Sequence, residues 1–71
     1  MNVYELEGDR SLLIRRKPSQ MPCGMDLDLM KIGASCLMDG PNDKITYDFL
    51  DAGRRAHAEA YLISCGWKKM P

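Results

Sequence analysis

Apolar and polar residues alternate along the first part of the chain. The segments 3–7 and 11–16 each follow the two-residue period of a β-strand, and a Gly-Asp pair at 8–9 separates them. A glycine in the first position of such a pair is typical of a tight hairpin turn of two residues. Leu12 and Ile14 share one face of the second strand. The pattern therefore predicts an N-terminal β-hairpin with one face more apolar than the other.

The middle of the chain carries a longer apolar segment. Residues 27–38 follow Asp26, which fits a helix N-cap, and precede Gly-Pro at 40–41, which fits a helix stop. The favoured interpretation is a helix that other elements cover on several sides. The alternative is a strand that pairs with residues 44–47 across the turn-rich segment 39–43, because short apolar runs fit either period. The sequence leaves both open.

The C-terminal segment predicts a helix over residues 47–65. Thr46 fits its N-cap, and Gly66 fits the residue that ends it. The helical period places small and apolar residues on one stripe, predicted to face the core: Phe49, Ala52, Gly53, Ala56, Ala60 and Ile63. The residues predicted to face away from the core are Asp51, Arg54, Arg55, Ala58, Glu59 and Leu62.

These elements predict an α+β fold for residues 1–71 as a single small domain. An N-terminal hairpin would be packed by one or two helices, of which the C-terminal one is long. A chain of 71 residues buries only roughly 60% of the surface that its unfolded form exposes. Its single core is expected to supply only a few kcal/mol, so a disulfide, a metal, a ligand or a second copy is a common support at this size.

Composition indicates which partners and which cellular compartment suit the chain. Ten basic and ten acidic residues cancel, which argues against a general attraction to nucleic acid or to an anionic membrane. No apolar run approaches the roughly 20 residues that span a bilayer, and the first residues lack the pattern of a signal peptide. Three cysteines cannot all pair with one another. The expectation is a cytoplasmic protein with free thiols.

A metal or a catalytic site is not expected. Cys23, Cys36, His57 and Cys65 have the ligand count of a structural zinc site, but they lie 13, 21 and 8 positions apart. Structural zinc sites usually bring ligands in close pairs two to four residues apart. No glycine-rich phosphate loop is present, and nothing in the sequence brings His57 to a thiol. The sequence predicts no enzyme, no metal and no cofactor.

A protein partner is the predicted ligand class. Arg54 and Arg55 on the exposed helix face and Trp67 beyond the helix are residue types that dominate interface energetics. The alternative for Trp67 is that its ring folds over the core. The favoured function is a small binding protein that regulates or inhibits a protein partner, a class that viruses and mobile elements encode. Another alternative is a minor subunit that folds fully only in a larger complex.

Nucleic acid is the alternative partner. Arg10, Arg15, Arg16 and Lys17 place four positive charges on the second strand and just beyond it, where a β-ribbon reaches phosphates. The zero net charge of the chain weighs against this interpretation. A run of basic residues at a strand end more often blunts edge-to-edge association.

A homodimer is the predicted oligomeric state. Ala52, Ala56 and Ala60 recur at four-residue intervals, with Gly53 beside them. Small residues on one helix face allow close approach of another backbone. The alternative is that the chain's own hairpin or first helix fills this groove.

Overall fold

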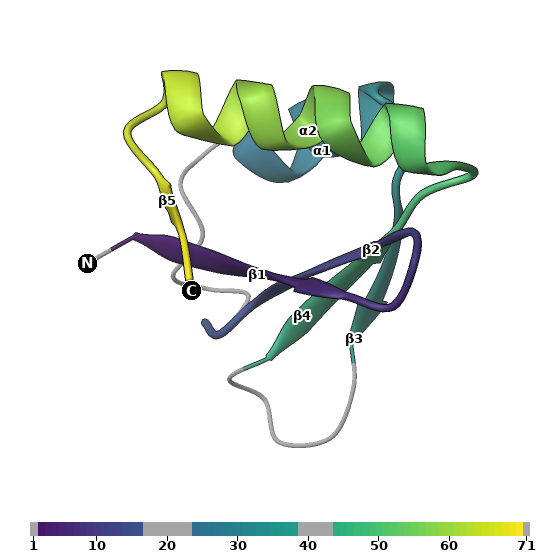
Figure 1. The fold of residues 1–71 in the computed structure, drawn as a ribbon, viewed down its shortest axis with the longest axis horizontal. Coiled ribbons are helices and arrows are strands. Elements are labelled where there is room, and N and C mark those ends of the chain that lie inside the picture. Colours follow the sequence, from purple (N-terminus) through teal and green to yellow (C-terminus); the bar gives the residue numbers. More distant parts are fainter. Residues whose placement is uncertain (1, 17–23, 39–43, 71) are drawn as a thin grey trace.

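The computed structural model describes residues 2–16, 24–38 and 44–70, and within the second range it describes the side chains only as far as Ser35. Two strands precede each of the two described helices along the chain (Figure 1). In chain order they are β1 (Val3–Glu7), β2 (Ser11–Ile14), α1 (Met25–Lys31), β3 (Ser35–Met38), β4 (Ile45–Asp48), α2 (Ala52–Ser64) and β5 (Lys68–Lys69). The chain therefore repeats a strand, strand, helix unit twice and adds a short strand.

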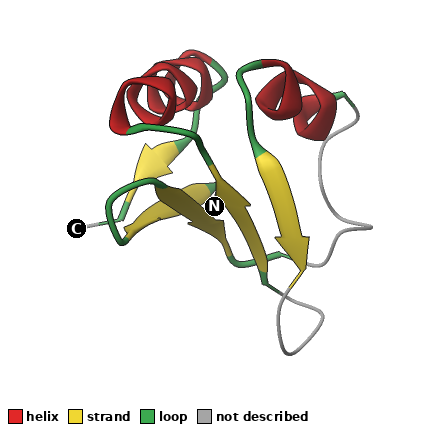
Figure 2. Ribbon diagram, turned by 90° about the vertical axis from the view of Figure 1, so that its right-hand side faces the viewer, coloured by secondary structure: helices red, strands yellow, loops and turns green. Residues whose placement is uncertain are grey.

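One sheet carries both helices. Its strand order is β3-β4-β2-β1-β5, with β2 and β4 antiparallel at the centre and β5 parallel to β1. Both helices lie on the same side of the sheet (Figure 2). This arrangement confirms the predicted α+β fold and the N-terminal hairpin. The last helix has 13 residues, which is shorter than predicted.

The core lies between the sheet and the helices. Alternate residues of the central strands point into it, because side chains on a strand alternate between faces. A single cluster of buried residues fills this space: Tyr4, Leu12, Ile14, Met25, Leu29, Ala34, Ile45, Tyr47, Phe49, Ala58, Leu62 and Trp67. Four aromatic rings contribute to this core, so large side chains make up for its small number of residues.

The other side of the sheet is its open face, which neither helix covers (Figure 2). Leu13 points to this face and is still only 4% exposed. Polar side chains surround it in pairs. Ser11 donates a hydrogen bond of 2.9 Å to Asp48, and Arg15 donates one of 2.7 Å to Glu5. Neighbouring side chains of the chain itself therefore cover the apolar residue on the open face.

The prediction of one helix over residues 27–38 is wrong in its second half. Helix α1 ends at Lys31, and the strand that follows pairs with β4, as the alternative interpretation held. Gly33 explains the break. Its φ of 111° belongs to the left-handed region that favours glycine. Its N–H binds the carbonyl of Met30, and the next N–H binds that of Leu29, which closes the helix end.

The prediction of a helix over residues 47–65 is wrong at its start. Its first residues form β4, in which Ile45 and Tyr47 are buried and alternate with half-buried residues. Thr46 therefore lies within a strand, and Asp51 is the N-cap of α2, where its side chain accepts the N–H of Arg54 at 2.8 Å. Strand pairing with β2 has overridden a plausible capping pattern. Gly66 follows the helix end, as predicted.

The turn of the N-terminal hairpin also differs in detail. Residues 8–10 connect β1 to β2, one more than the two-residue turn that the sequence predicted. The carbonyl of Arg10, the last of them, accepts the N–H of Phe49 at 2.9 Å. Neither described helix is long and apolar enough to cross a membrane.

Candidate functional site

Helix α2 packs on the sheet with the face that was predicted to face away. Ala58 and Leu62 have no exposed surface, whereas every described apolar residue on the opposite face of the helix is exposed. We call that exposed face the outer ridge, which also includes Leu50 just before the helix: Leu50, Ala52, Gly53, Ala56, Ala60 and Ile63. The predicted buried stripe is therefore wrong for all of its members within α2.

Two features of the sequence produced this error. Both faces of α2 carry small residues, so the helical period alone does not choose between Ala56 with Ala60 and Ala58 with Leu62. The prediction also counted Phe49 as part of the helix. That residue is 1% exposed and follows β4, so its burial says nothing about which helix face turns inward.

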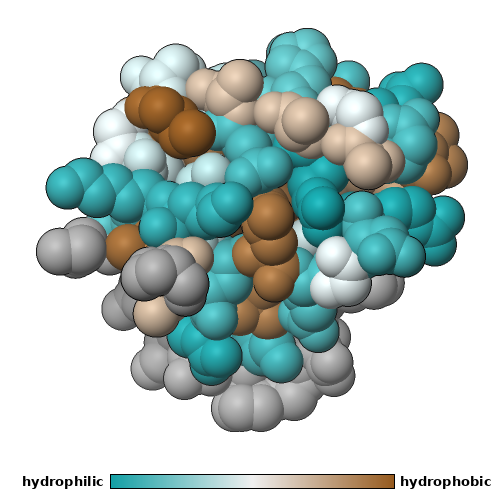
Figure 3. Space-filling view, viewed as in Figure 1, coloured by the Kyte–Doolittle hydropathy of each residue, from teal (hydrophilic) through white to brown (hydrophobic). Residues whose placement is uncertain are grey.

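The outer ridge runs the length of α2. Figure 3 shows it as a row of hydrophobic residues along the upper part of the molecule, above a flank on which hydrophilic residues surround a central hydrophobic patch. Its largest members stand at the two ends, where Leu50 is 69% and Ile63 is 58% exposed. Leu27 and Met30 of α1 are exposed as well, at 63% and 46%. The helix layer thus carries most of the large apolar side chains that the described chain leaves exposed.

Three tyrosine hydroxyls join the helices to the sheet and to each other. Each donates a hydrogen bond to a carboxylate on a helix. The donor and acceptor pairs are Tyr4 with Glu59 at 3.1 Å, Tyr47 with Asp26 at 2.6 Å and Tyr61 with Asp28 at 2.6 Å. The side chain of Asp26 therefore fixes α1 to β4. It does not cap α1, whose N-cap is Gly24, so the predicted cap is wrong.

The hydroxyls of Tyr4 and Tyr61 hold their protons more tightly than a tyrosine in water. Burial and the hydrogen bond to Glu59 raise the pKa of Tyr4 to about 12. The hydrogen bond to Asp28, together with burial and the nearby Cys65 thiol, raises the pKa of Tyr61 above its ordinary value. A hydroxyl that stays protonated and donates to a carboxylate is a poor general acid or base at neutral pH. The contacts are structural.

The two arginines of α2 occupy different environments. Arg55 reaches the β1–β2 turn and donates to the carbonyls of Gly8 at 2.9 Å and Ser11 at 3.5 Å. Arg54 is exposed, and its guanidinium lies 3.1 Å from the point that a Cβ on Gly33 would occupy. Arg54 therefore stays accessible beside the end of α1, whereas Arg55 already bonds to the hairpin.

Trp67, the third residue of the predicted partner site, lies in the core. Its side chain is 3% exposed, which agrees with the alternative that the ring folds over the core. The guanidinium of Arg16 lies over the ring, 5.5 Å from its centroid. The structure does not bring Trp67 to the surface beside the two arginines.

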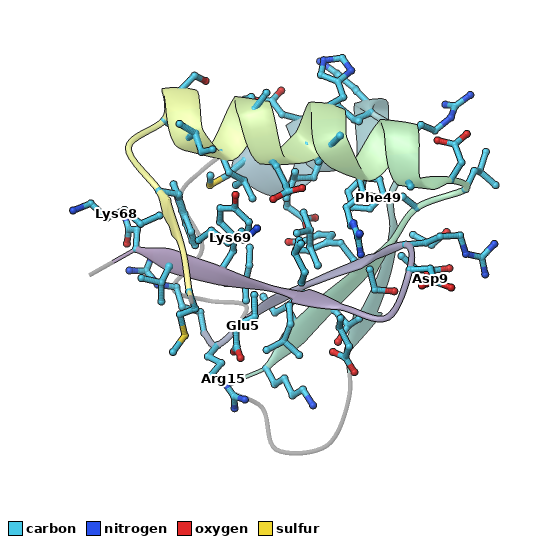
Figure 4. All side chains as sticks on the ribbon, in the orientation of Figure 1. Glu5, Asp9, Arg15, Phe49, Lys68 and Lys69 are labelled. Carbon is cyan, nitrogen blue, oxygen red and sulfur yellow. The ribbon has the colours of Figure 1, made fainter. Side chains whose placement is uncertain are left out.

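The basic residues proposed for nucleic acid are also separated. Arg10 lies in the β1–β2 turn and Arg15 just after β2, at opposite ends of that strand. Lys17 is outside the described residues. The structure instead brings Lys68 and Lys69 of β5 toward the end of the sheet where Arg15 and Arg16 lie, which the sequence alone did not reveal. Figure 4 shows Arg15 beside Glu5 below the sheet and Lys68 pointing outward.

The residues considered for zinc remain apart where the structure describes them. His57 and Cys65 are both exposed and lie eight positions apart along α2 and its end, roughly 12 Å at the helical rise. Cys23 and the side chain of Cys36 lie outside the described part. Among the described residues, no three His, Cys, Asp or Glu side chains are grouped so that they could hold a metal ion.

The four residues of the predicted dimer interface share one surface. Ala52, Gly53, Ala56 and Ala60 are all exposed on the outer ridge, so neither the hairpin nor α1 fills this face. The most distinctive surface of the chain is therefore an uncovered apolar helix face. Comparison with protein-family models, curated proteins and solved structures gave no match, so the geometry of this surface is the basis for assigning a function.

Proposed function

We propose that the chain is a small non-enzymatic binding protein that regulates or inhibits a protein partner through the outer ridge. The observation that carries the proposal is the exposure of Leu50 and Ile63, at 69% and 58%, with only small residues between them. Contiguous exposed apolar surface costs free energy in water and commonly marks a protein interaction site. A partner that covers the ridge removes that cost.

The shape of the ridge suits a helix or a flat surface as its counterpart. Ala52, Ala56 and Ala60 add little bulk, so a partner approaches the backbone of α2 closely along its length. Leu50 and Ile63 at the two ends supply the larger contacts. Arg54 follows Gly53 in the chain and is exposed, so it adds a charged group near the first turn of α2.

The proposal of a binding role without catalysis is supported by the environment of the titratable groups. Tyr4 and Tyr61 have raised pKa values, and their hydroxyls join α2 to β1 and to α1. Their protons are committed to these contacts. The exposed thiol of Cys65 supports a cytoplasmic location, because a reducing compartment keeps such a thiol from forming disulfides.

A second copy of the chain is the second candidate for the ridge. If two α2 helices pack antiparallel, Ile63 of one copy meets the partner's Gly53, and Ala56 meets the partner's Ala60. The largest residue of the helix face then faces the smallest, and residues of equal size face each other. Such complementarity fills space at the density of a protein interior. This spacing is the observation that favours a homodimer.

Two matched variants test the ridge. Ala56→Glu places a charge at the middle of the ridge, and Ser35→Glu places the same charge on an exposed strand residue away from it. Tagged parent and variants are used to capture partners from the native host, with folding checked by circular dichroism. Sedimentation equilibrium near 100 μM, where a dimer of micromolar affinity is largely associated, tests self-association.

The expected result is that Ala56→Glu loses the captured protein, or the dimer, while Ser35→Glu keeps it. A buried charge without a counterion explains the loss. The proposal fails if a folded Ala56→Glu protein keeps every association of the parent. If the parent captures a host protein but does not self-associate in the centrifuge, the docking role is supported and the homodimer is rejected.

A further inference from the structure

Four basic residues gather at one end of the sheet, although they lie far apart in the sequence. Two of them directly follow β2, and the other two form β5. We call this group the basic corner: Arg15, Arg16, Lys68 and Lys69. It is separate from the outer ridge and does not depend on the function proposed for it.

The strand pairing brings the two segments together. Parallel pairing sets Lys68 beside Val3 of β1. On the other side of β1, Glu5 pairs with Leu13 in an antiparallel register. Extended by two residues, this register places Arg15 opposite Val3. Adjacent strands are about 4.8 Å apart, so the backbones of Arg15 and Lys68 lie roughly 10 Å apart across one intervening strand. The next residue, Lys69, points to the opposite face of the sheet.

Arg16 is held in place at this corner. Its guanidinium donates a hydrogen bond of 2.6 Å to the side chain of Asn2 and lies over the ring of Trp67, which precedes Lys68 directly. The stacking keeps the positive charge beside β5 and leaves the residue half-buried. Arg16 therefore links the β2 end of the corner to its β5 end.

Positive charge at the corner is only partly neutralised. Arg15 pairs with Glu5 at 2.7 Å, and the Arg15 side chain stays 64% exposed. Lys68 and Lys69 are exposed, and neither forms an ion pair with any other described residue. Among the described residues, the exposed charges of Arg15, Lys68 and Lys69 therefore lie near a single ion-paired carboxylate, that of Glu5.

We propose that the basic corner binds the phosphate backbone of double-stranded nucleic acid without regard to base sequence. Lysine side chains on two faces of one strand suit a row of phosphates, because each acts as a point charge. Base stacking is not available at the corner. Tyr4, Tyr47, Phe49 and Trp67 are each at most 3% exposed, so no ring is presented to an unpaired base.

Salt dependence gives the first test, with a fluorescent 20-base-pair DNA duplex as the probe. Up to three phosphate contacts, from Arg15, Lys68 and Lys69, predict that the logarithm of the binding constant falls with that of salt concentration at a slope between about −2 and −3. Two duplexes of unrelated sequence should bind with affinities within a factor of about two. No detectable binding at 50 mM salt with 100 μM protein would overturn the proposal.

Three alanine variants locate the binding surface. Lys68→Ala and Lys69→Ala should each weaken binding at 50 mM salt roughly tenfold and make the salt slope shallower by about 1. Lys31→Ala is the matched control, because it removes the same charge from an exposed position on α1. Thermal melting establishes that all three variants fold. Equal losses in Lys31→Ala and in the β5 variants would reject the corner as the site.

An acidic polypeptide is the competing ligand, and a third measurement addresses it. Polyglutamate of matched length carries the charge of an acidic protein surface without the spacing of phosphates. Tighter binding of the duplex than of polyglutamate at the same salt supports nucleic acid. Polyglutamate that binds as tightly as the duplex would contradict the proposal and assign the corner to an acidic protein.

Discussion

The open face of the sheet and the outer ridge of α2 both face solvent, but only one of them is covered by its own side chains. On the open face Leu13 is 4% exposed, between the Ser11–Asp48 and Arg15–Glu5 contacts. On the ridge Leu50 and Ile63 are more than half exposed. The difference teaches that this small sheet can stand without a second layer on its open face, whereas the ridge stays exposed and is the surface that we propose a partner covers.

Side-chain chemistry explains why the two surfaces differ. On the open face, polar side chains meet across neighbouring segments, Ser11 with Asp48 and Arg15 with Glu5. The side chains of alanine and glycine on the ridge are too short to cover their neighbours, so the larger residues at its ends stay exposed. Small residues therefore create the exposure as well as the room for a partner.

The largest expected effect is a difference in the free energy of unfolding between substitutions on the two faces of α2. Leu62→Ala removes a fully buried side chain and should lower the free energy of unfolding by about 2–5 kcal/mol. Ile63→Ala changes the next residue, which is 58% exposed, and should cost less than about 0.5 kcal/mol. Urea denaturation measures both. Similar losses for the two variants would mean that the helix does not pack as described.

A smaller effect is expected on the open face. Leu13→Ala should cost about 2 kcal/mol, near the lower limit for a buried leucine, because side chains cover it on one side only and can close over the gap. Leu12→Ala, at the neighbouring position in the core, is the comparison and should cost more. If Leu13→Ala has no effect on urea denaturation, the polar pairs do not shield that residue.

Alkaline pH should weaken the contacts beneath the ridge and leave the open face unchanged. The pKa of Tyr4 is about 12 in the folded chain, against 10.0 for a tyrosine exposed to water. The stability from this shift is fully present below pH 10 and lost as pH rises from 10 to 12, on the order of 1–2 kcal/mol. Stability curves at several pH values measure it. Tyr4→Phe should flatten the decline, and an unchanged decline would contradict the assignment.

The smallest expected effect concerns the two arginines. Arg55→Ala loses the hydrogen bonds to the carbonyls of Gly8 and Ser11 and should cost about 1 kcal/mol. Arg54→Ala removes an exposed side chain and should stay within about 0.5 kcal/mol. Partner capture by the same variants distinguishes their roles: Arg54→Ala should weaken capture more, relative to its effect on stability. The opposite order would move the partner contact to the hairpin side of α2.

The sequence predicted the hairpin and the α+β class because the signals for these are local. Alternation and a glycine turn identify β1 and β2 without knowledge of the rest of the chain. The boundaries of α1 and α2 were missed because β4 pairs with β2, which is distant in sequence, and β3 in turn pairs with β4. Ile45 and Tyr47 alternate as a strand does, but Thr46 between them also fits a helix cap.

The sites were less predictable than the fold, for a related reason. Residue type marked Trp67 as an interface residue, but its burial depends on how the chain returns after α2 to pair with β1. The exposure of Ala56 and Ala60 likewise depends on which face the sheet selects. Both outcomes rest on tertiary packing, which a single sequence does not encode in any local pattern.

Photo-crosslinking in the native host tests the docking role of the ridge most directly. A benzophenone amino acid replaces Ala60 on the ridge in one protein and Glu7 on the open face in another, since both positions are exposed. The account predicts a protein adduct from position 60, at the mass of two chains or of the chain plus a partner, and none from position 7. Adducts from position 7 with none from position 60 would contradict it.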